Sequence, residues 1–220
     1  LHSWINNLNL KKTKTIWDDY SKTNTYKNKE FENKKNVVAE FVAKIKPDQL
    51  IDLGCNTGQF SEEALEKGAN YVIGYDFDQN AVDEAFKISK SKKINFLPLV
   101  FDASNPSPNQ GWMQVERKGF FERSKAKALI ALAFEHHLAI AKNIPLDQII
   151  EWIAKLAPFG LIEFVPKIDE TVQLMLANRE DIFDEYNELN FEKLLKTKSK
   201  IIKKTKVSES GRIIYEFETL

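Results

Sequence analysis

The sequence has little of several features that mark particular classes of protein. It contains one cysteine, Cys55, which excludes an internal disulfide and predicts a reducing, cytoplasmic setting. No apolar run approaches the roughly 18 to 20 residues of a membrane-spanning helix, so we expect no membrane partner. The formal net charge is zero, which argues against a strongly electrostatic partner and leads us to disfavour nucleic acid. The oligomeric state is not indicated.

A chain of 220 residues, 43% of them hydrophobic, is long enough for one full core. We predict an α/β domain over residues 36–220, preceded by an arm over residues 1–35. The arm is rich in Lys, Asn and Thr but also carries aromatic residues, and disordered segments are poor in these. We therefore expect it to dock on the domain as a packed extension, with a lid over the site as the alternative.

Apolar segments of strand length alternate with segments of helical periodicity along the domain. Strands are predicted at residues 50–53, 71–76, 94–101, 128–134 and 161–165, and helices at 34–45, 60–67, 79–89, 146–156 and within 171–195. Residues 201–207 and 212–219 read as a β-hairpin. The fold class is therefore α/β: a Rossmann-like, seven-stranded, mostly parallel sheet with helices on both faces and a C-terminal antiparallel hairpin.

A turn with two glycines follows the first strand. Gly54 and Gly58 allow backbone conformations with positive φ and the close approach of a ligand, and the next helix presents its free N–H groups there. The spacing differs from the G-x-G-x-x-G of dinucleotide sites and from a phosphate-binding P-loop. The turn indicates a nucleotide or nucleoside at the carboxyl end of a parallel sheet.

Acidic residues end the next two strands. Asp76 stands about 20 residues beyond the turn, the spacing at which a carboxylate meets ribose hydroxyls in both NAD and adenosyl ligands. Asp78 is expected to cap the following helix. Asp102, with Ala103 beside it, suits an acceptor for an adenine amino group, with a turn or cap as the alternative.

The motif Asp52-Leu53-Gly54-Cys55-Asn56-Thr57-Gly58, with Asp76 and Asp102 at the following strand ends, resembles class I S-adenosylmethionine-dependent methyltransferases. The segments 102–112, 135–140, 143–146, 162–167 and 179–183 are similar to a bacterial subfamily related to the nodulation protein NoeA. The resemblance implies S-adenosyl-L-methionine as cofactor. The residues we expect to bind it are Asp52, Gly54, Cys55, Asn56, Gly58, Asp76, Phe77, Asp102, Ala103 and Phe134.

Glu135, His136 and His137 follow the fourth strand, where an acceptor should lie. Methyl transfer depends chiefly on holding the acceptor in line with the methyl carbon, and a base helps only some acceptors. We expect His136 to be that base, with Glu135 as its orienting partner and His137 as the other candidate. The alternatives are a histidine bonded to backbone and a metal site, which adjacent histidines disfavour; we predict no metal.

Two further segments have competing interpretations. Trp112, Phe120 and Phe121 could line an acceptor pocket, but we favour core packing. The lysines within residues 193–206 could contact RNA, but we favour a solvated face that guards an edge strand.

We therefore predict a methyltransferase that uses S-adenosylmethionine and acts on a small molecule rather than a macromolecule. The alternatives are a methyltransferase acting on RNA or protein, and a cofactor-binding domain without catalysis. An NAD-dependent dehydrogenase is a weaker alternative because G-x-G-x-x-G is absent.

Overall fold

A computed structural model describes residues 3–4 and 28–220. Most of the predicted arm, and with it the proposed lid, lies outside the described residues. The predicted boundary at residue 36 falls inside a helix, because α3 runs from Asn28 to Ile45. Residues 28–35 are therefore the first half of α3 rather than the end of an arm.

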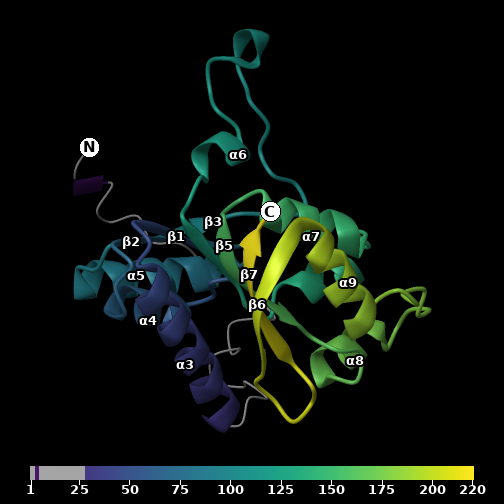
Figure 1. Cartoon of the computed structure of the whole chain (residues 1–220). Coiled ribbons are helices and arrows are strands. Elements are labelled where there is room, and N and C mark those ends of the chain that lie inside the picture. Colours follow the sequence, from purple (N-terminus) through teal and green to yellow (C-terminus); the bar gives the residue numbers. More distant parts are fainter. Residues whose placement is uncertain (1–2, 5–27) are drawn as a thin grey trace.

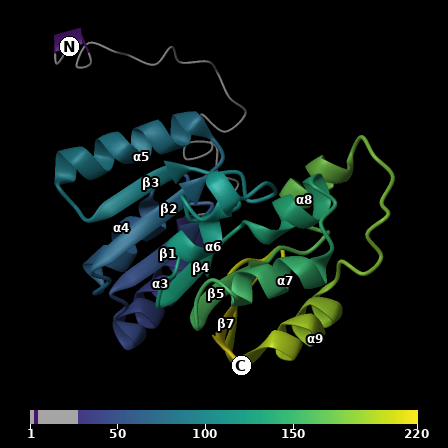
Figure 2. The ribbon, with the colours of Figure 1, turned by 90° about the horizontal axis from the view of Figure 1, so that it is seen from above.

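The seven-stranded sheet has the predicted topology (Figures 1 and 2). Its strand order is β3-β2-β1-β4-β5-β7-β6; only β7 and β6 run antiparallel to their neighbours. The strands are β1 (Gln49–Leu53), β2 (Tyr71–Asp76), β3 (Phe96–Val100), β4 (Ala128–Ala131), β5 (Phe159–Phe164), β6 (Ser199–Lys206) and β7 (Ile213–Thr219). The predicted Rossmann-like fold class is confirmed.

Helices cover both faces of the sheet (Figure 2). On one face, α3, α4 (Gln59–Glu66) and α5 (Gln79–Lys92) pack over a core that includes Val38 and Leu50. On the other, α6 (Phe120–Arg123), α7 (Leu146–Ala154) and α9 (Glu188–Lys198) pack over a core that includes Leu129 and Ile150. A single π-helical turn, η2 (His137–Ala141), and α8 (Glu170–Leu176) follow the carboxyl ends of β4 and β5. Among the described residues, no helix combines the length and apolarity needed to cross a membrane.

Hydrogen bonds from the backbone to carboxylate side chains fix the start of α5 and the end of β4. The predicted cap is confirmed, because Asp78 Oδ1 accepts the N–H groups of Asn80 and Ala81 at the start of α5. Strand β4 stops at Ala131, three residues earlier than predicted, because Ala133 has a left-handed φ of 48° and donates its N–H to Glu163 Oε2. Its backbone therefore leaves the sheet.

Between β3 and β4 the chain forms a projecting arm, residues 108–119, which rises from the amino-terminal edge of the sheet (Figure 1). The preference for core packing is correct for Phe120, which is buried. It is wrong for Trp112 and Phe121, which are 78% and 44% exposed, because the arm carries Trp112 away from the core.

Candidate functional site

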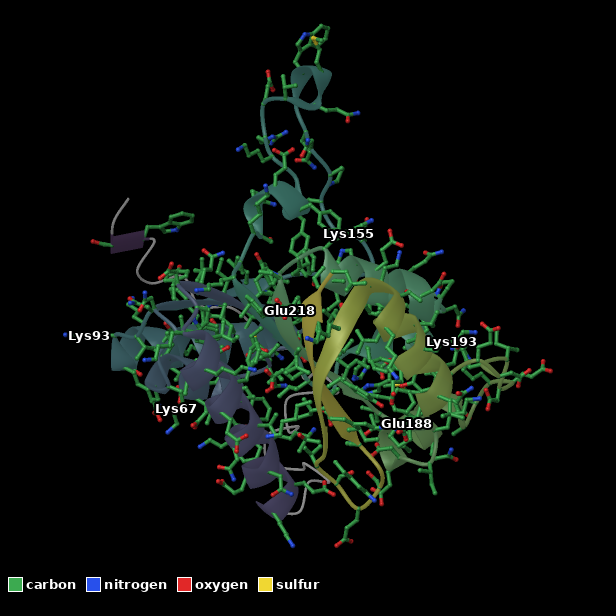
Figure 3. The ribbon with its side chains drawn as sticks, viewed as in Figure 1. Lys67, Lys93, Lys155, Glu188, Lys193 and Glu218 are labelled. Carbon is green, nitrogen blue, oxygen red and sulfur yellow. The ribbon has the colours of Figure 1, made fainter. Side chains whose placement is uncertain are left out.

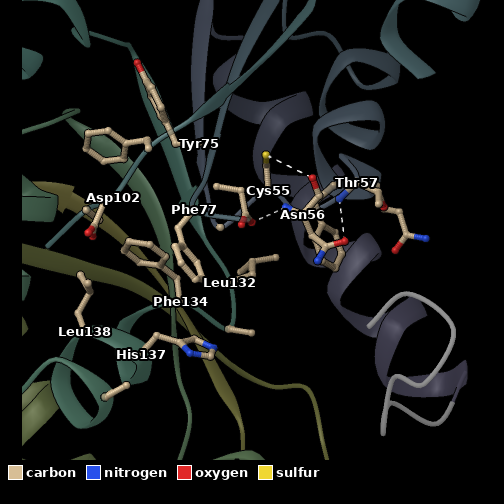
Figure 4. Close-up of a pocket in the computed structure, with 18 of the residues that line it drawn as sticks. Cys55, Asn56, Thr57, Tyr75, Phe77, Asp102, Leu132, Phe134, His137 and Leu138 are labelled. Carbon is tan, nitrogen blue, oxygen red and sulfur yellow. Dashed lines mark hydrogen bonds between the residues drawn. The ribbon is translucent and has the colours of Figure 1, made fainter. Parts of the chain in front are cut away.

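The carboxyl ends of the parallel strands surround a cavity of about 340 Å³, a size typical of small-ligand sites. Figure 4 shows the hydrogen-bonded turn 55–57 on one side of it and Phe134 and His137 on another. Nine of the predicted site residues line the cavity: Gly54, Cys55, Asn56, Asp76, Phe77, Asp102, Ala103, Phe134 and His137. Asp52, Gly58, Glu135 and His136 are not among its lining residues.

The glycine turn is held in place by the neighbouring strand. The N–H groups of Gly54 and Cys55 both donate to the Tyr75 carbonyl oxygen of β2, at 2.8 and 3.1 Å. Gly58 has a φ of 90°, and a Cβ at this position would lie 2.3 Å from the Phe96 ring. The turn therefore requires glycine for its conformation and for its contact with Phe96.

Asp52 lies beneath the turn. Its side chain is buried and accepts a 2.6 Å hydrogen bond from the Ser61 hydroxyl in α4. Burial raises the pKa of Asp52 to about 7. Its observed contact joins β1 to the first turn of α4, so it stabilises the loop that faces the cavity.

Asp76 presents its carboxylate to the cavity in a fixed orientation. One oxygen accepts the Asn56 N–H at 2.8 Å and the other accepts the Asp78 N–H at 2.9 Å. Burial raises the pKa of Asp76, while these two backbone donors oppose the shift. Each oxygen keeps a lone pair for a ligand hydroxyl.

The part of the cavity lined by Phe77 and Asp102 is more open to solvent. Phe77 is 63% exposed at the mouth. Asp102 is exposed, and Oδ1 of its side chain accepts hydrogen bonds from the N–H and the hydroxyl of Ser104, which hold its pKa below the usual value. A planar ligand group would therefore meet one aromatic face and one carboxylate.

The two histidines occupy different environments. His137 lines the cavity; burial and the charge of Arg212 lower its pKa to about 4. His136 is fully buried, neither ring nitrogen has a hydrogen-bond partner among the described residues, and burial lowers its pKa well below the usual value. Both rings are neutral at neutral pH, and only His137 faces the space where an acceptor would lie.

Glu135 points into the protein and not into the cavity. It is fully buried, and burial raises its pKa to about 8. The Tyr186 hydroxyl lies 2.6 Å from Glu135 Oε1 and 2.7 Å from the Val165 carbonyl oxygen. Since this hydroxyl has one proton, both contacts are satisfied together only when the Glu135 carboxyl carries its own proton.

The sequence did not reveal Lys34 as a site residue. Lys34 lines the cavity from α3, and its ammonium lies 2.7 Å from Glu163 Oε1, with both side chains at most 1% exposed. Glu163 also accepts the Ala133 N–H at 2.7 Å. Position 34 precedes Val38 by four residues on the apolar face of the helix, and a lysine on that face is a signal of a buried charge. The other lining residues that were missed are Phe31, Thr57, Gln59, Phe60, Tyr75, Phe101, Leu132, Ala133, Leu138, Ala141 and Lys142.

Comparisons with known proteins identify the family and the fold. Residues 21–138 match the family model of FtsJ-like methyltransferases. The chain is 52% identical over 219 residues to nodulation protein NoeA of Rhizobium meliloti; the match covers 99% of this chain and 46% of the relative, so the chain spans about half of its length. The fold is shared with the N-methyltransferase NodS of Bradyrhizobium japonicum bound to S-adenosyl-L-homocysteine (TM-score 0.64, 10% identity, 92% of both chains). It is also shared with an rRNA methylase of Escherichia coli (TM-score 0.58, 12% identity, 87% of this chain and 65% of that one).

The prediction that disfavoured nucleic acid as a partner is wrong. The chain matches the FtsJ-like methyltransferase family, and two solved structures that share its fold are rRNA methylases, one from Escherichia coli and the other the 16S rRNA methylase RmtB. A net charge of zero averages over the whole surface and does not describe any one region of it. Because the family match covers more than half of the chain, the chain belongs to the FtsJ-like methyltransferases.

Proposed function

We propose that the cavity binds S-adenosylmethionine and presents its methyl group to an acceptor at the end lined by Phe134 and His137. The observation that carries this proposal is the Asp76 carboxylate, fixed by two backbone N–H groups at the edge of the cavity. It suits two ribose hydroxyls. Phe77 and Asp102 would then hold the adenine, and the turn that contains Gly54 and Asn56 would hold the methionine portion.

Little chemistry is required of the protein. The sulfonium supplies an activated methyl group when the cofactor is bound, so the chain must orient the acceptor and exclude water. Phe134 and Leu132 supply apolar walls at this end. A neutral His137 accepts a hydrogen bond from an acceptor N–H or O–H and so orients its lone pair; with a pKa of about 4, it is a weak base.

RNA is the acceptor class that we propose. One exposed cation, Lys142, lines the cavity and can contact an anionic acceptor, whereas the charge of the buried Lys34 is already neutralised by Glu163. The relation to FtsJ-like methyltransferases and the rRNA methylases that share the fold support the same choice.

Cofactor binding is tested by titration calorimetry with S-adenosylhomocysteine. We expect the wild type to bind and Asp76→Ala to lose roughly 10- to 100-fold in affinity, the value of charge-assisted hydrogen bonds. Asp83→Ala is the matched control. Asp83 is a partly exposed carboxylate on α5, outside the cavity, and among the described residues its ion-pair partner is Lys87. Absence of binding by the wild type would refute the proposal.

The acceptor is tested by transfer of a radiolabelled methyl group into total RNA and, separately, into total protein of the same extract. We expect label in RNA, and less of it with His137→Ala than with His136→Ala, because only His137 faces the cavity. Label confined to protein would exclude RNA as the acceptor and leave methyl transfer itself intact.

A further inference from the structure

The projecting arm, residues 108–119, has a defined structure although it stands clear of the body (Figure 3). Gln110 and Arg117 exchange two backbone hydrogen bonds of 2.9 and 3.0 Å, which close the loop. At its tip Met113 and Gln114 have left-handed φ values of 53° and 60°, which are uncommon for residues other than glycine. A loop held in such a conformation presents its side chains in one arrangement.

That arrangement exposes apolar side chains. Trp112, Met113 and Val115 are 78%, 76% and 79% exposed. Isolated exposed apolar residues are ordinary, but three at the end of one rigid loop form a contact surface. The indole ring of Trp112 is also a large π-face on which a nucleobase can stack.

The arm and the residues that lead from it to β4 carry an excess of positive charge. The arm itself has Arg117 and Lys118 against Glu116, and residues 120–127 add Arg123, Lys125 and Lys127 against Glu122. None of the five cations forms an ion pair with another residue in the described part of the chain, whereas Lys196, Lys198, Lys203 and Lys204 of the C-terminal lysine run all do. The positive charges of the arm and of the residues after it are therefore available to an anionic partner.

Phe120, the residue that follows the arm, packs against a side chain that lines the cavity. Phe120, at the start of α6, is buried and stacks on Phe101 with a centroid separation of 4.3 Å. Phe101 lines the cavity. The arm itself rises from the opposite edge of the sheet (Figure 1), so a partner that reaches both places must be extended. A polynucleotide strand meets this requirement.

We propose that the arm is a second contact site for the RNA acceptor, in which Trp112 stacks on an unpaired base while Arg117 and Lys118 contact neighbouring phosphates. This inference rests on the proposed function. Aromatic stacking combined with cations along a strand is the usual mode of single-stranded RNA binding. The observed surface matches that mode more closely than an apolar protein interface, whose core is depleted of charge.

The test measures the binding of a fluorescein-labelled oligouridylate of about 30 nucleotides by fluorescence anisotropy. We expect Trp112→Ala to weaken binding roughly 10-fold. The double variant Arg117→Gln/Lys118→Gln should also weaken it and should reduce the slope of log K against log salt by roughly 1. Leu189→Ala and Lys90→Gln/Lys93→Gln, at exposed positions of α9 and α5, are the matched controls and should bind as the wild type does.

The outcomes separate this inference from the proposed function. If both arm variants bind RNA as the wild type does, or if the control variants lose as much affinity as the arm variants, the proposal that the arm is an RNA site is refuted. A wild type that binds S-adenosylhomocysteine but no RNA would overturn both the arm site and the RNA acceptor, and leave cofactor-dependent methyl transfer standing. Melting temperatures equal to that of the wild type show that the variants are folded.

Discussion

The two ends of the cavity, to which we assign the cofactor and the acceptor, are built in different ways. At the cofactor end, Asp76 is oriented by backbone N–H groups within a few residues of β1 and β2. At the acceptor end, Lys34 of α3, Glu163 of β5 and the backbone of Ala133 meet from distant parts of the chain. Arg212 extends this cluster through a bidentate pair with Asp169. One end depends on local turns, and the other depends on buried charges that must be satisfied together.

The largest effect should follow from breaking the buried pair at the acceptor end. Lys34→Met leaves Glu163 buried without its ammonium partner, and removal of one member of such a pair typically costs about 3–5 kcal/mol. Urea unfolding monitored by circular dichroism measures this loss. The double variant Lys34→Met/Glu163→Leu should recover part of it, since no charge of the pair then remains. A double variant as unstable as the sum of the two single variants would show that the pair is not coupled.

The next effect is the pH dependence that Glu135 confers. Its pKa is about 8 in the folded protein and near 4.5 in the unfolded protein. As the pH rises, Glu135 therefore loses its proton at a lower pH in the unfolded state than in the folded state. Glu135 alone should therefore lower the free energy of unfolding by on the order of 3 kcal/mol as pH rises from about 5 to about 8, and the raised pKa of Asp52 adds a change of the same sign.

Glu135→Gln isolates this contribution. The amide does not titrate, so the stability of the wild type relative to the variant should decline across this interval. The histidines, whose lowered pKa values act in the opposite direction at lower pH, are the same in both proteins. A difference that stays constant with pH would mean that Glu135 is ionised in the folded state.

A smaller effect is expected at the cofactor end. Gly58→Ala places a methyl group against the Phe96 ring at a left-handed position and should cost about 2 kcal/mol, together with some cofactor affinity. Gly68→Ala is the control, because its φ is also positive but the nearest atom to a Cβ is 3.9 Å away. Thermal unfolding of both variants separates the cost of backbone strain from the cost of the contact with Phe96. Equal losses of stability in the two variants would assign the whole effect to backbone strain.

The smallest effect is expected for an exposed ion pair. Lys203→Gln removes the pair with Glu40, in which both side chains are at least half exposed, and should change the free energy of unfolding by less than about 0.5 kcal/mol. The same urea experiment checks it. A loss comparable to that of Lys34→Met would remove the distinction between buried and exposed pairs in this protein.

The two ends also differ in how far the sequence predicts them. Gly54, Asp76 and Asp102 follow strands whose parallel order is evident from the alternation of elements, so their meeting at one edge could be predicted. Lys34 and Glu163 are 129 residues apart, and no local pattern links them. The sequence also placed His136 and His137 just after the fourth strand, but the irregular backbone after β4 decides that His137 lines the cavity and His136 does not. The sequence did not reveal the projecting arm at residues 108–119, and core packing was favoured for Trp112, because the exposure of this segment depends on the tertiary fold.

Cys55 has a practical consequence for experiments on this molecule. It is the only cysteine in the sequence; it lines the cavity, it is buried, and burial keeps its pKa well above the usual value. The thiolate is the reactive form, so this thiol reacts slowly with alkylating reagents. A cysteine introduced at Gln114 on the exposed tip can therefore carry a dye without labelling of the site itself. Slow modification of Cys55 then serves as an independent measure of how well the cavity is occupied.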